Sequence, residues 1–171
     1  MITKQMSEIP TIQIWEEPPT QETGSSSPCV LTQEADLLLA YSVRNLAFPG
    51  WDKKAPPNDP GLVEKSAVLR FKTVLIFSFG YPNSEALGGH PLYRFGLKHY
   101  GFHWVENSPW IAKLRAQNRT HPQHRDALWE KWRHWIVTFE DKTLEVIAAS
   151  ASTVGNFDAV NPLQALNKVV A

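Results

Sequence analysis

Apolar and polar residues alternate along several stretches of this chain, which is typical of β-strands with one buried face. In residues 134–150, two alternating runs flank Asp141-Lys142 and predict a β-hairpin. Residues 67–79 predict a long strand, or two strands with a bend near Lys72-Thr73. From Val74 onward both faces of this segment are apolar, so we expect its second half to be buried on both sides.

Two shorter stretches also alternate. Residues 37–43 predict a strand, although their leucines and alanine also favour a helix. Residues 97–106 predict a strand that carries Tyr100, Phe102 and Trp104 on one face. The proline-rich stretch 48–60 is expected to form a loop.

Two helices are predicted. Ser108-Pro109 is a good helix start, because serine caps the first turn and proline fits its first position. This short helix should end near Asn118, with a buried stripe of Trp110, Ile111 and Leu114. Residues 162–171 have apolar side chains at helical spacing and predict a terminal helix docked on the sheet.

Five or more strands with a short helix and a C-terminal helix predict an α+β fold that is mainly β. We expect a twisted antiparallel sheet or a half-barrel. Residues 1–30 are interpreted as an acidic, Pro/Ser-rich flexible arm, with ordered structure from near Leu31. Residues 31–150 are expected to form one sheet domain, and residues 151–171 a linker and helix.

The composition of the 171-residue chain, 43% hydrophobic and 20% charged, is ordinary for one globular domain. The longest apolar run, residues 74–77, is too short to span a bilayer, and the N-terminus does not resemble a signal peptide. Cys29 is alone, so no internal disulfide is possible. These features predict a cytoplasmic protein without membrane contact.

Seventeen basic and seventeen acidic residues cancel, but they are unevenly distributed. Residues 1–36 carry one lysine against six carboxylates, and residues 94–134 carry eight basic against three acidic side chains. Each stretch could present a solvated face. Alternatively, the basic stretch meets an anion or is covered by the acidic arm.

All six histidines lie between His90 and His134, and five of the seven tryptophans lie between Trp104 and Trp135. On a strand, His99 and His103 would lie about 13 Å apart, too far for one metal ion. The loop residues His121 and His124 are only weak candidates for metal ligands. We therefore predict no metal site and no cofactor, and expect the histidines to hydrogen-bond, stack or face water.

The loop 80–93 follows the long apolar strand directly. It could be an ordered connection, or it could line a small polar pocket. In the second case its candidate binding residues are Glu85, His90 and Tyr93.

Basic and aromatic side chains are interleaved in the same region, as in many nucleic-acid binders. The neutral net charge of the chain argues against that function. The further candidate binding residues are Arg119, His121, His124, Arg133 and His134.

No catalytic nucleophile is indicated, because the chain lacks a Gly-x-Ser-x-Gly motif and Cys29 lies in the expected arm. Glu140, Asp141 and Glu145 flank the hairpin turn, where a solvated turn is the simpler interpretation than an acid/base pair. The catalytic residues of any enzyme function are therefore unknown.

Residues 80–92 (GYPNSEALGGHPL), 106–111 (ENSPWI), 118–124 (NRTHPQH) and 133–139 (RHWIVTF) resemble a group of uncharacterised bacterial proteins. The resemblance covers roughly residues 35–149. It implies a bacterial source and one structural unit from the first strand to the last hairpin, and it transfers no activity.

The leading hypothesis is a binding or regulatory module, not an enzyme. It would recognise a partner protein or small ligand through the loop 80–93 and the His/Trp-rich region 90–135. The alternatives are a small hydrolytic enzyme, with or without a metal ion, and a protein that binds nucleic acid or another polyanion.

Overall fold

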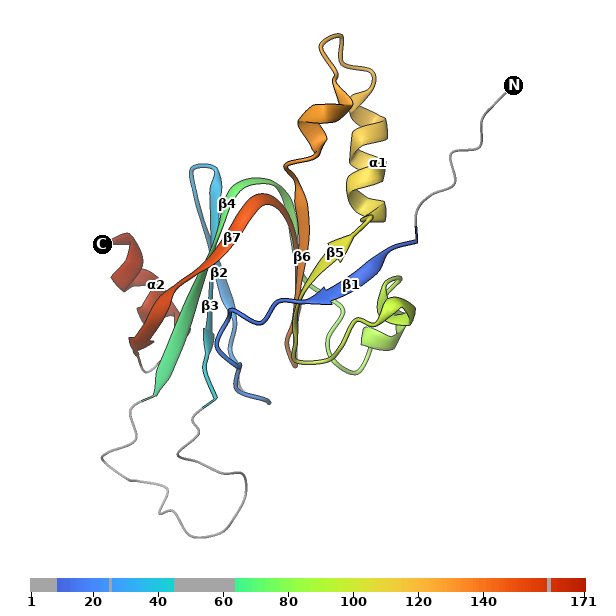
Figure 1. The fold of residues 1–171 in the computed structure, drawn as a ribbon. Coiled ribbons are helices and arrows are strands. Elements are labelled where there is room, and N and C mark those ends of the chain that lie inside the picture. Colours follow the sequence, from blue (N-terminus) through green and yellow to red (C-terminus); the bar gives the residue numbers. More distant parts are fainter. Residues whose placement is uncertain (1–8, 25, 45–63, 160) are drawn as a thin grey trace.

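A computed structural model describes residues 9–24, 26–44, 64–159 and 161–171. The fold is α+β and mainly β, as the sequence predicts. Seven antiparallel strands form one sheet in the order β1-β5-β6-β7-β4-β3-β2 (Figure 1). The loop expected at 48–60 lies outside the described residues.

The bounds of the elements agree with the predicted hairpin, both helices and the strands near 37–43 and 67–79. The strands are β1 (Thr11–Ile14), β2 (Cys29–Gln33), β3 (Asp36–Ser42), β4 (Lys65–Gly80), β5 (Phe102–Glu106), β6 (Arg133–Thr138) and β7 (Thr143–Asp158). The helices are α1 (Pro109–Asn118) and α2 (Pro162–Val170), with short 3₁₀ turns η1 (Leu87–Gly89), η2 (Tyr93–Phe95) and η3 (Asp126–Trp129).

The long strands β4 and β7 bend together, and the sheet curves with them, so that one half of the sheet faces the other (Figure 1). Thr73 of β4 has φ +54°, and the pairing register shifts between Val74 and Ile76. The Thr73 N–H donates to Asp36 Oδ1 at 3.0 Å, which ties the bend to the β2–β3 turn. The bend predicted near Lys72-Thr73 is therefore confirmed.

The main core fills the space between the two halves of the sheet. It includes Leu39, Tyr41 and Phe71 from one half and Trp135, Phe139 and Val146 from the other. On the outer face, α2 buries Ala165 and Leu166 against β3 and β4, which confirms the predicted docking of the terminal helix. The outer face of β5 and β6 is covered by the loop that carries η1 and η2, through Leu87, Leu92 and Leu97.

The expectation of a flexible N-terminal arm is wrong for the described residues of that segment. Strand β1 pairs with β5, and Trp15 packs edge-on against Phe71. The buried Gln21 side chain donates to the Thr138 carbonyl at 3.0 Å, and the Tyr41 hydroxyl donates to the Pro19 carbonyl at 2.7 Å. Hydrogen bonds to the sheet therefore order a segment whose composition offers little apolar surface.

The strand expected at 97–106 begins only at Phe102. Residues 97–101 form a turn in which Tyr100 has φ +52°. The Thr138 hydroxyl donates to the Lys98 carbonyl at 2.7 Å and accepts from the Gly101 N–H at 2.9 Å. These contacts between distant parts of the chain override the local alternation of apolar residues.

Two burial expectations also fail. The second half of β4 is not buried on both sides, because Leu75, Ile76 and Phe77 are exposed. Helix α1 has no fully buried residue, because it projects beyond the end of the sheet (Figure 1). In addition, β7 continues to Asp158, well into the segment expected to be a linker.

Candidate functional site

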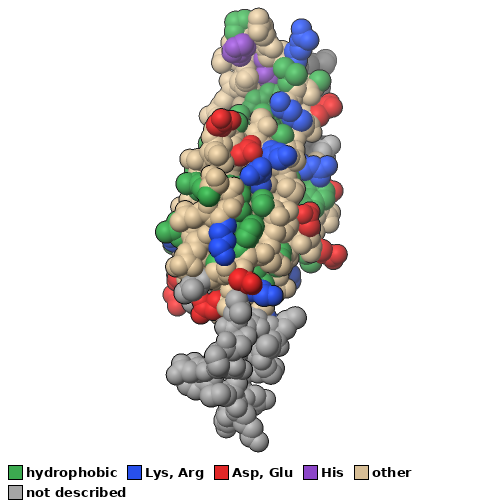
Figure 2. Space-filling view, turned by 90° about the vertical axis from the view of Figure 1, so that its left-hand side faces the viewer, with side chains coloured by type: hydrophobic (Ala, Val, Ile, Leu, Met, Phe, Trp, Pro, Cys, Tyr) green, Lys and Arg blue, Asp and Glu red, His purple; other side chains and the backbone are tan. Residues whose placement is uncertain are grey.

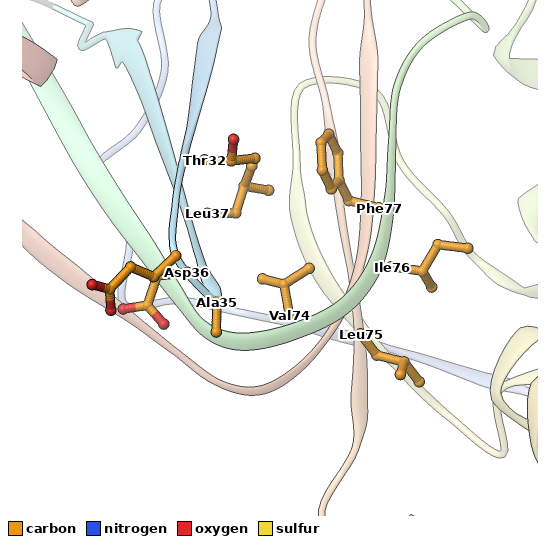
Figure 3. A pocket seen from close by; sticks show the side chains of 9 residues that line it. Thr32, Ala35, Asp36, Leu37, Val74, Leu75, Ile76 and Phe77 are labelled. Atoms are coloured by element: carbon orange, nitrogen blue, oxygen red, sulfur yellow. The ribbon is translucent and has the colours of Figure 1, made fainter.

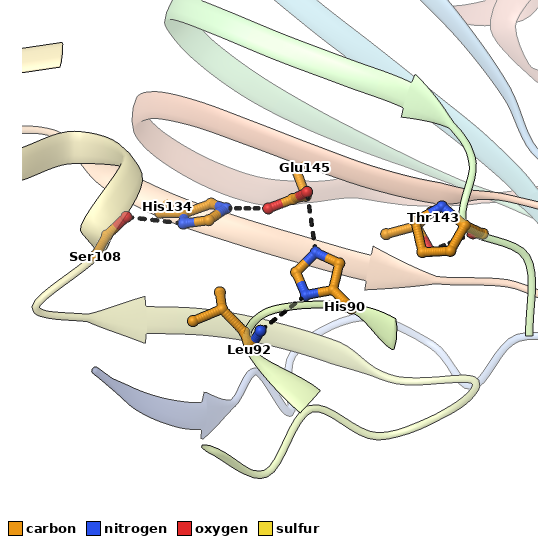
Figure 4. Close-up of polar contacts among 7 residues, drawn as sticks. His90, Leu92, Ser108, His134, Thr143 and Glu145 are labelled. Carbon is orange, nitrogen blue, oxygen red and sulfur yellow. Dashed lines mark hydrogen bonds and ion pairs between the residues drawn. The ribbon is translucent and has the colours of Figure 1, made fainter. Parts of the chain in front are cut away.

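Two histidines converge on one carboxylate on the outer face of the sheet. Glu145 of β7 accepts hydrogen bonds from His134 Nε2 at 3.0 Å and from His90 Nε2 at 3.1 Å (Figure 4). The His134 and His90 side chains are 1% and 6% exposed, and that of Glu145 is 23% exposed. We call these three residues the His–Glu–His bridge.

Strand alternation and pairing place the bridge. Glu145 lies opposite Ile136, and His134 lies opposite Ile147, so both side chains are on the outer face of the β6–β7 hairpin. His90 directly follows η1 and comes from the covering loop. Its Nδ1 accepts from the Leu92 N–H at 3.1 Å, so its hydrogen is on Nε2 and points to Glu145.

The bridge continues to the start of helix α1. The Ser108 hydroxyl lies 2.9 Å from His134 Nδ1 and accepts from the Ile111 N–H at 3.2 Å, as an N-cap. A hydroxyl that donates to Nδ1 leaves the His134 hydrogen on Nε2, where Glu145 accepts it. The Trp110 ring packs edge-on against the His134 ring at 5.3 Å. Every side-chain polar atom of Ser108, His134, Glu145 and His90 therefore has a hydrogen-bond partner.

The electrostatics of the bridge favour an ionised carboxylate. Burial by itself would raise the pKa of Glu145, but the hydrogen bonds from His134 and His90 outweigh it and lower the pKa to about 2. Glu145 is therefore an anion at neutral pH that accepts from two fixed N–H donors. This arrangement holds β7, β6 and the covering loop together.

A groove of about 1200 Å³ lies beside the bridge, and its lining includes Ser108 and Leu92, which are hydrogen-bonded to the two histidines. Its walls come from η2 and the residues before it, β5, helix α1 and the segment 129–133. The charged and aromatic residues of its lining are Arg94, Phe95, Trp104, Glu106, Arg115, Arg119, Trp129, Glu130, Trp132 and Arg133.

The four arginines of the groove are in two different situations. Arg119 lies 3.5 Å from Asp126, and Arg115 lies 4.0 Å from the same carboxylate. Arg94 and Arg133 have no such acidic partner among the described residues. Instead, their guanidinium groups lie over aromatic rings, at 4.7 Å from the centre of Phe95 and 5.1 Å from that of Trp104.

The bridge fixes two walls of the groove. Ser108 lines the groove and is bonded to His134, while Leu92 lines it and donates to His90. Glu145 connects the two histidines, so helix α1 and the covering loop are tied to the same carboxylate. The hydrogen bonds of the bridge therefore position two walls of the groove, and the arginines of the groove take no part in these bonds.

The described residues of the acidic stretch do not cover the basic stretch at this groove. Among residues 1–36, Pro10 is the one described residue that lines it. Acidic, basic and apolar side chains are mixed over the face of the molecule that carries α2 (Figure 2). The arginines of the groove gather elsewhere, around α1 and β5.

The structure brings together some of the predicted site residues and separates others. His90 and His134 share Glu145, and Arg119 and Arg133 line the groove. His124 lies 2.9 Å from Asp126, and His121 accepts from the Gln123 N–H beyond α1. In the covering loop, Glu85 is exposed and Tyr93 packs against the His99 ring.

Glu145 of the bridge and Ser108, which is bonded to the bridge, were not predicted as site residues. Ser108 was expected to act only as a helix cap, and Glu145 to be part of a solvated turn. The sequence feature that could have indicated Glu145 is its position as a single carboxylate between two apolar residues, Leu144 and Val146, which are buried. Its function as an acceptor became visible only when the histidines were placed beside it.

Within the described part of the chain, no group of three or more His, Cys, Asp or Glu residues could hold a metal ion. None of its helices is both long and apolar enough to cross a membrane. No protein-family model matches this chain, and no curated protein or solved structure matches it significantly. The resemblance to uncharacterised bacterial proteins stays a prediction.

Proposed function

We propose that this protein is a binding module whose groove receives an acidic segment of a partner protein. The observation that carries this proposal is the exposed Arg133, which lies over Trp104 without an acidic partner among the described residues. Arg94 repeats this arrangement on Phe95 at another wall. Arginine and tryptophan are the residues most often found at the energetic centres of protein interfaces.

The size of the groove favours an extended ligand. Sites for single small molecules typically enclose about 300–1,000 Å³. This groove has about 1200 Å³, which is above that range. A peptide segment fills such a space, and its apolar side chains would contact Trp129 and Trp132.

The charges favour a peptide with a few carboxylates over a polyanion. Asp126 already pairs with Arg119 and lies near Arg115, which reduces their attraction for a further anion. Glu106 and Glu130 also line the groove and would repel a phosphate backbone. Two available guanidinium groups match a short acidic motif that also carries apolar side chains.

Selection from a displayed random peptide library tests this proposal. We expect enriched peptides that combine aspartate or glutamate with large apolar residues. The variant Arg133→Glu should weaken their binding roughly tenfold or more, which corresponds to about 1.4 kcal/mol. The control is Lys113→Glu, because Lys113 is an exposed basic residue of helix α1, a wall of the groove, but does not itself line the groove.

Three outcomes would contradict the proposal. The first is the absence of any enriched sequence, and the second is enrichment of peptides without acidic residues. The third is tight binding of oligothymidine with affinity that falls steeply with added salt, which would indicate the polyanion function instead.

Hydrolysis is the second candidate function, because Ser108, His134 and Glu145 form a continuous line of hydrogen bonds at the groove. The seryl hydroxyl would attack and His134 would accept its proton. Ser108 is only 5% exposed and also caps α1, which favours a structural role. Covalent labelling by a fluorophosphonate that is lost in Ser108→Ala would support hydrolysis, and no labelling would exclude this nucleophile.

We also propose a cytoplasmic location. Cys29 is the single cysteine of the chain, and partial burial raises the pKa of its thiol. A chain with one cysteine has no internal disulfide, which suits a reducing compartment, where disulfides are rare. Fractionation of the source cells, with the protein found in the periplasmic or secreted fraction, would contradict this location.

A further inference from the structure

The second half of β4 is an unpaired sheet edge within the described structure. Strand β3 pairs with β4 only as far as Phe71, and the β2–β3 turn reaches Val74 through the Ala35 carbonyl. From residue 76 to residue 80, β4 pairs with β7 on one side. No described strand pairs with its other side.

Apart from the register shift between Val74 and Ile76 at its start, this edge carries none of the charges or prolines with which proteins protect unpaired strands. Exposed edges are usually short, charged or interrupted by proline. Residues 73–80 (TVLIFSFG) contain neither a charge nor a proline. Leu75, Ile76 and Phe77 are 42%, 36% and 38% exposed, which is a continuous run of large apolar side chains on the edge.

The side chains of this edge point in two directions. Val74 and Phe77 face Thr32 and Leu37 across a pocket of about 300 Å³ between the two halves of the sheet, while Leu75 and Ile76 point away from it (Figure 3). Both faces of the edge are therefore apolar. An added strand would find apolar contacts above and below its backbone.

We infer that β4 pairs, antiparallel, with β4 of a second copy of this chain. Because residues 73–80 carry no charge, two identical strands can lie side by side without like charges opposing each other. The ends of the edge also differ in charge. Asp36 is bonded beside the Val74 end, whereas the Lys142 ammonium lies 4.9 Å from the centre of the Phe79 ring. Antiparallel pairing brings each acidic end of one copy to the basic group of the other.

The pairing register is limited by the alternation of side chains. Residues that lie opposite each other in a sheet place their side chains on the same face. The two-fold axis must therefore lie where one residue faces the same residue of the other copy, and not between two successive residues. An axis at Phe77 sets Ile76 against Ser78 on the outer face and brings the two Phe77 rings together beside the pocket, while Leu75 lies at the register shift and outside this pairing. An axis at Ser78 sets Phe77 against Phe79 and Ile76 against Gly80, so both registers bring apolar rings together on the pocket face.

Sedimentation equilibrium of the full chain tests the inference. The wild type should have the mass of two 19.4-kDa chains in the micromolar range. Ile76→Lys, which places a charge on the edge, should have the mass of one chain. Val154→Lys is the matched control, because Val154 is an exposed strand residue with 40% exposure on β7 and should remain dimeric.

Cross-linking tests the register and does not depend on the lysine variant. In a Cys29→Ser background, Phe77→Cys should form an intermolecular disulfide under mild oxidation, and Val154→Cys should not. A disulfide at Ser78→Cys instead would place the axis one residue further and still support the dimer. A wild type with the mass of one chain at all concentrations, or no cross-link at either position, would overturn the inference. In the first case the edge would be open to a strand of a different protein.

Discussion

Glu145 Oε2 accepts a hydrogen bond from His134 Nε2 at 3.0 Å, and its second oxygen accepts one from His90 at 3.1 Å. A β-hairpin, a covering loop and the first turn of α1 are joined through this one carboxylate. The contact explains why a carboxylate can stay in a mostly buried position. It also determines how substitutions at the site will affect stability.

Replacing Glu145 should destabilise the fold. Glu145→Leu leaves the Nε2–H groups of His134 and His90 without an acceptor, and each such buried donor costs about 1–3 kcal/mol. We therefore expect a loss of about 2–6 kcal/mol in the free energy of unfolding. Glu145→Gln should lose less, because its carbonyl still accepts from one histidine. Urea denaturation measures both, and equal losses would contradict this interpretation.

Stability should depend on pH in the acid range. The pKa of Glu145 is about 2 in the folded protein and 4.5 as its ordinary value, so the unfolded state binds the proton more readily. The stabilisation is complete above pH 4.5 and is lost as the pH falls from 4.5 towards 2. The loss amounts to about 3 kcal/mol. Unfolding free energies of the wild type and Glu145→Gln between these pH values should converge, and parallel curves would contradict the assignment.

A residue with a side chain does not fit at position 101, because the His103 ring lies against the Gly101 backbone. A Cβ atom on Gly101 would lie 2.3 Å from Cε1 of the His103 ring, which is 1% exposed and has no room to move. Gly101→Ala should therefore cost about 1–3 kcal/mol. In a His103→Ala background the same substitution should cost much less. A double-mutant cycle with thermal unfolding measures this coupling, and additive effects would exclude the clash.

Ser108 should contribute more than an ordinary helix cap. Ser108→Ala removes the acceptor of the Ile111 N–H and the partner of His134 Nδ1, and capping by itself contributes about 0.5–2 kcal/mol. Asn161→Ala on α2 is the comparison, because the Asn161 side chain accepts from the Gln164 N–H as an N-cap. We expect the Ser108 variant to lose more stability and to shift the emission of Trp110. Equal losses without a spectral change would reduce Ser108 to a cap.

The short-range rules of the sequence predicted a large part of the fold. Alternation located β3, β4, β6 and the start of β7, and the Ser108-Pro109 pair located α1. The alternation of apolar and polar residues failed to predict the backbone conformation where contacts with distant parts of the chain determine it. Residues 97–101 alternate like a strand, but the Thr138 side chain holds them in a turn. Residues 11–26 have few apolar side chains, but hydrogen bonds and Trp15 order much of them on the sheet.

The candidate site was predictable in its residue types and not in its geometry. Clustering of histidine, arginine and tryptophan indicated the correct region, including His90, Arg133 and His134. Which histidines meet depends on the pairing of β6 with β7 and on the path of the covering loop. Burial of β4 was overestimated, because alternation reports how apolar each face is and not whether another layer covers it.

By itself, therefore, the sequence determined the identity of most strands, both helices and the chemical character of the groove, since these follow from side chains within a few residues of one another. The tertiary structure decided that Glu145 stands between two histidines and that one edge of β4 stays open. Both depend on segments tens of residues apart, whose relative position is determined by the bend of the sheet and the packing of its core.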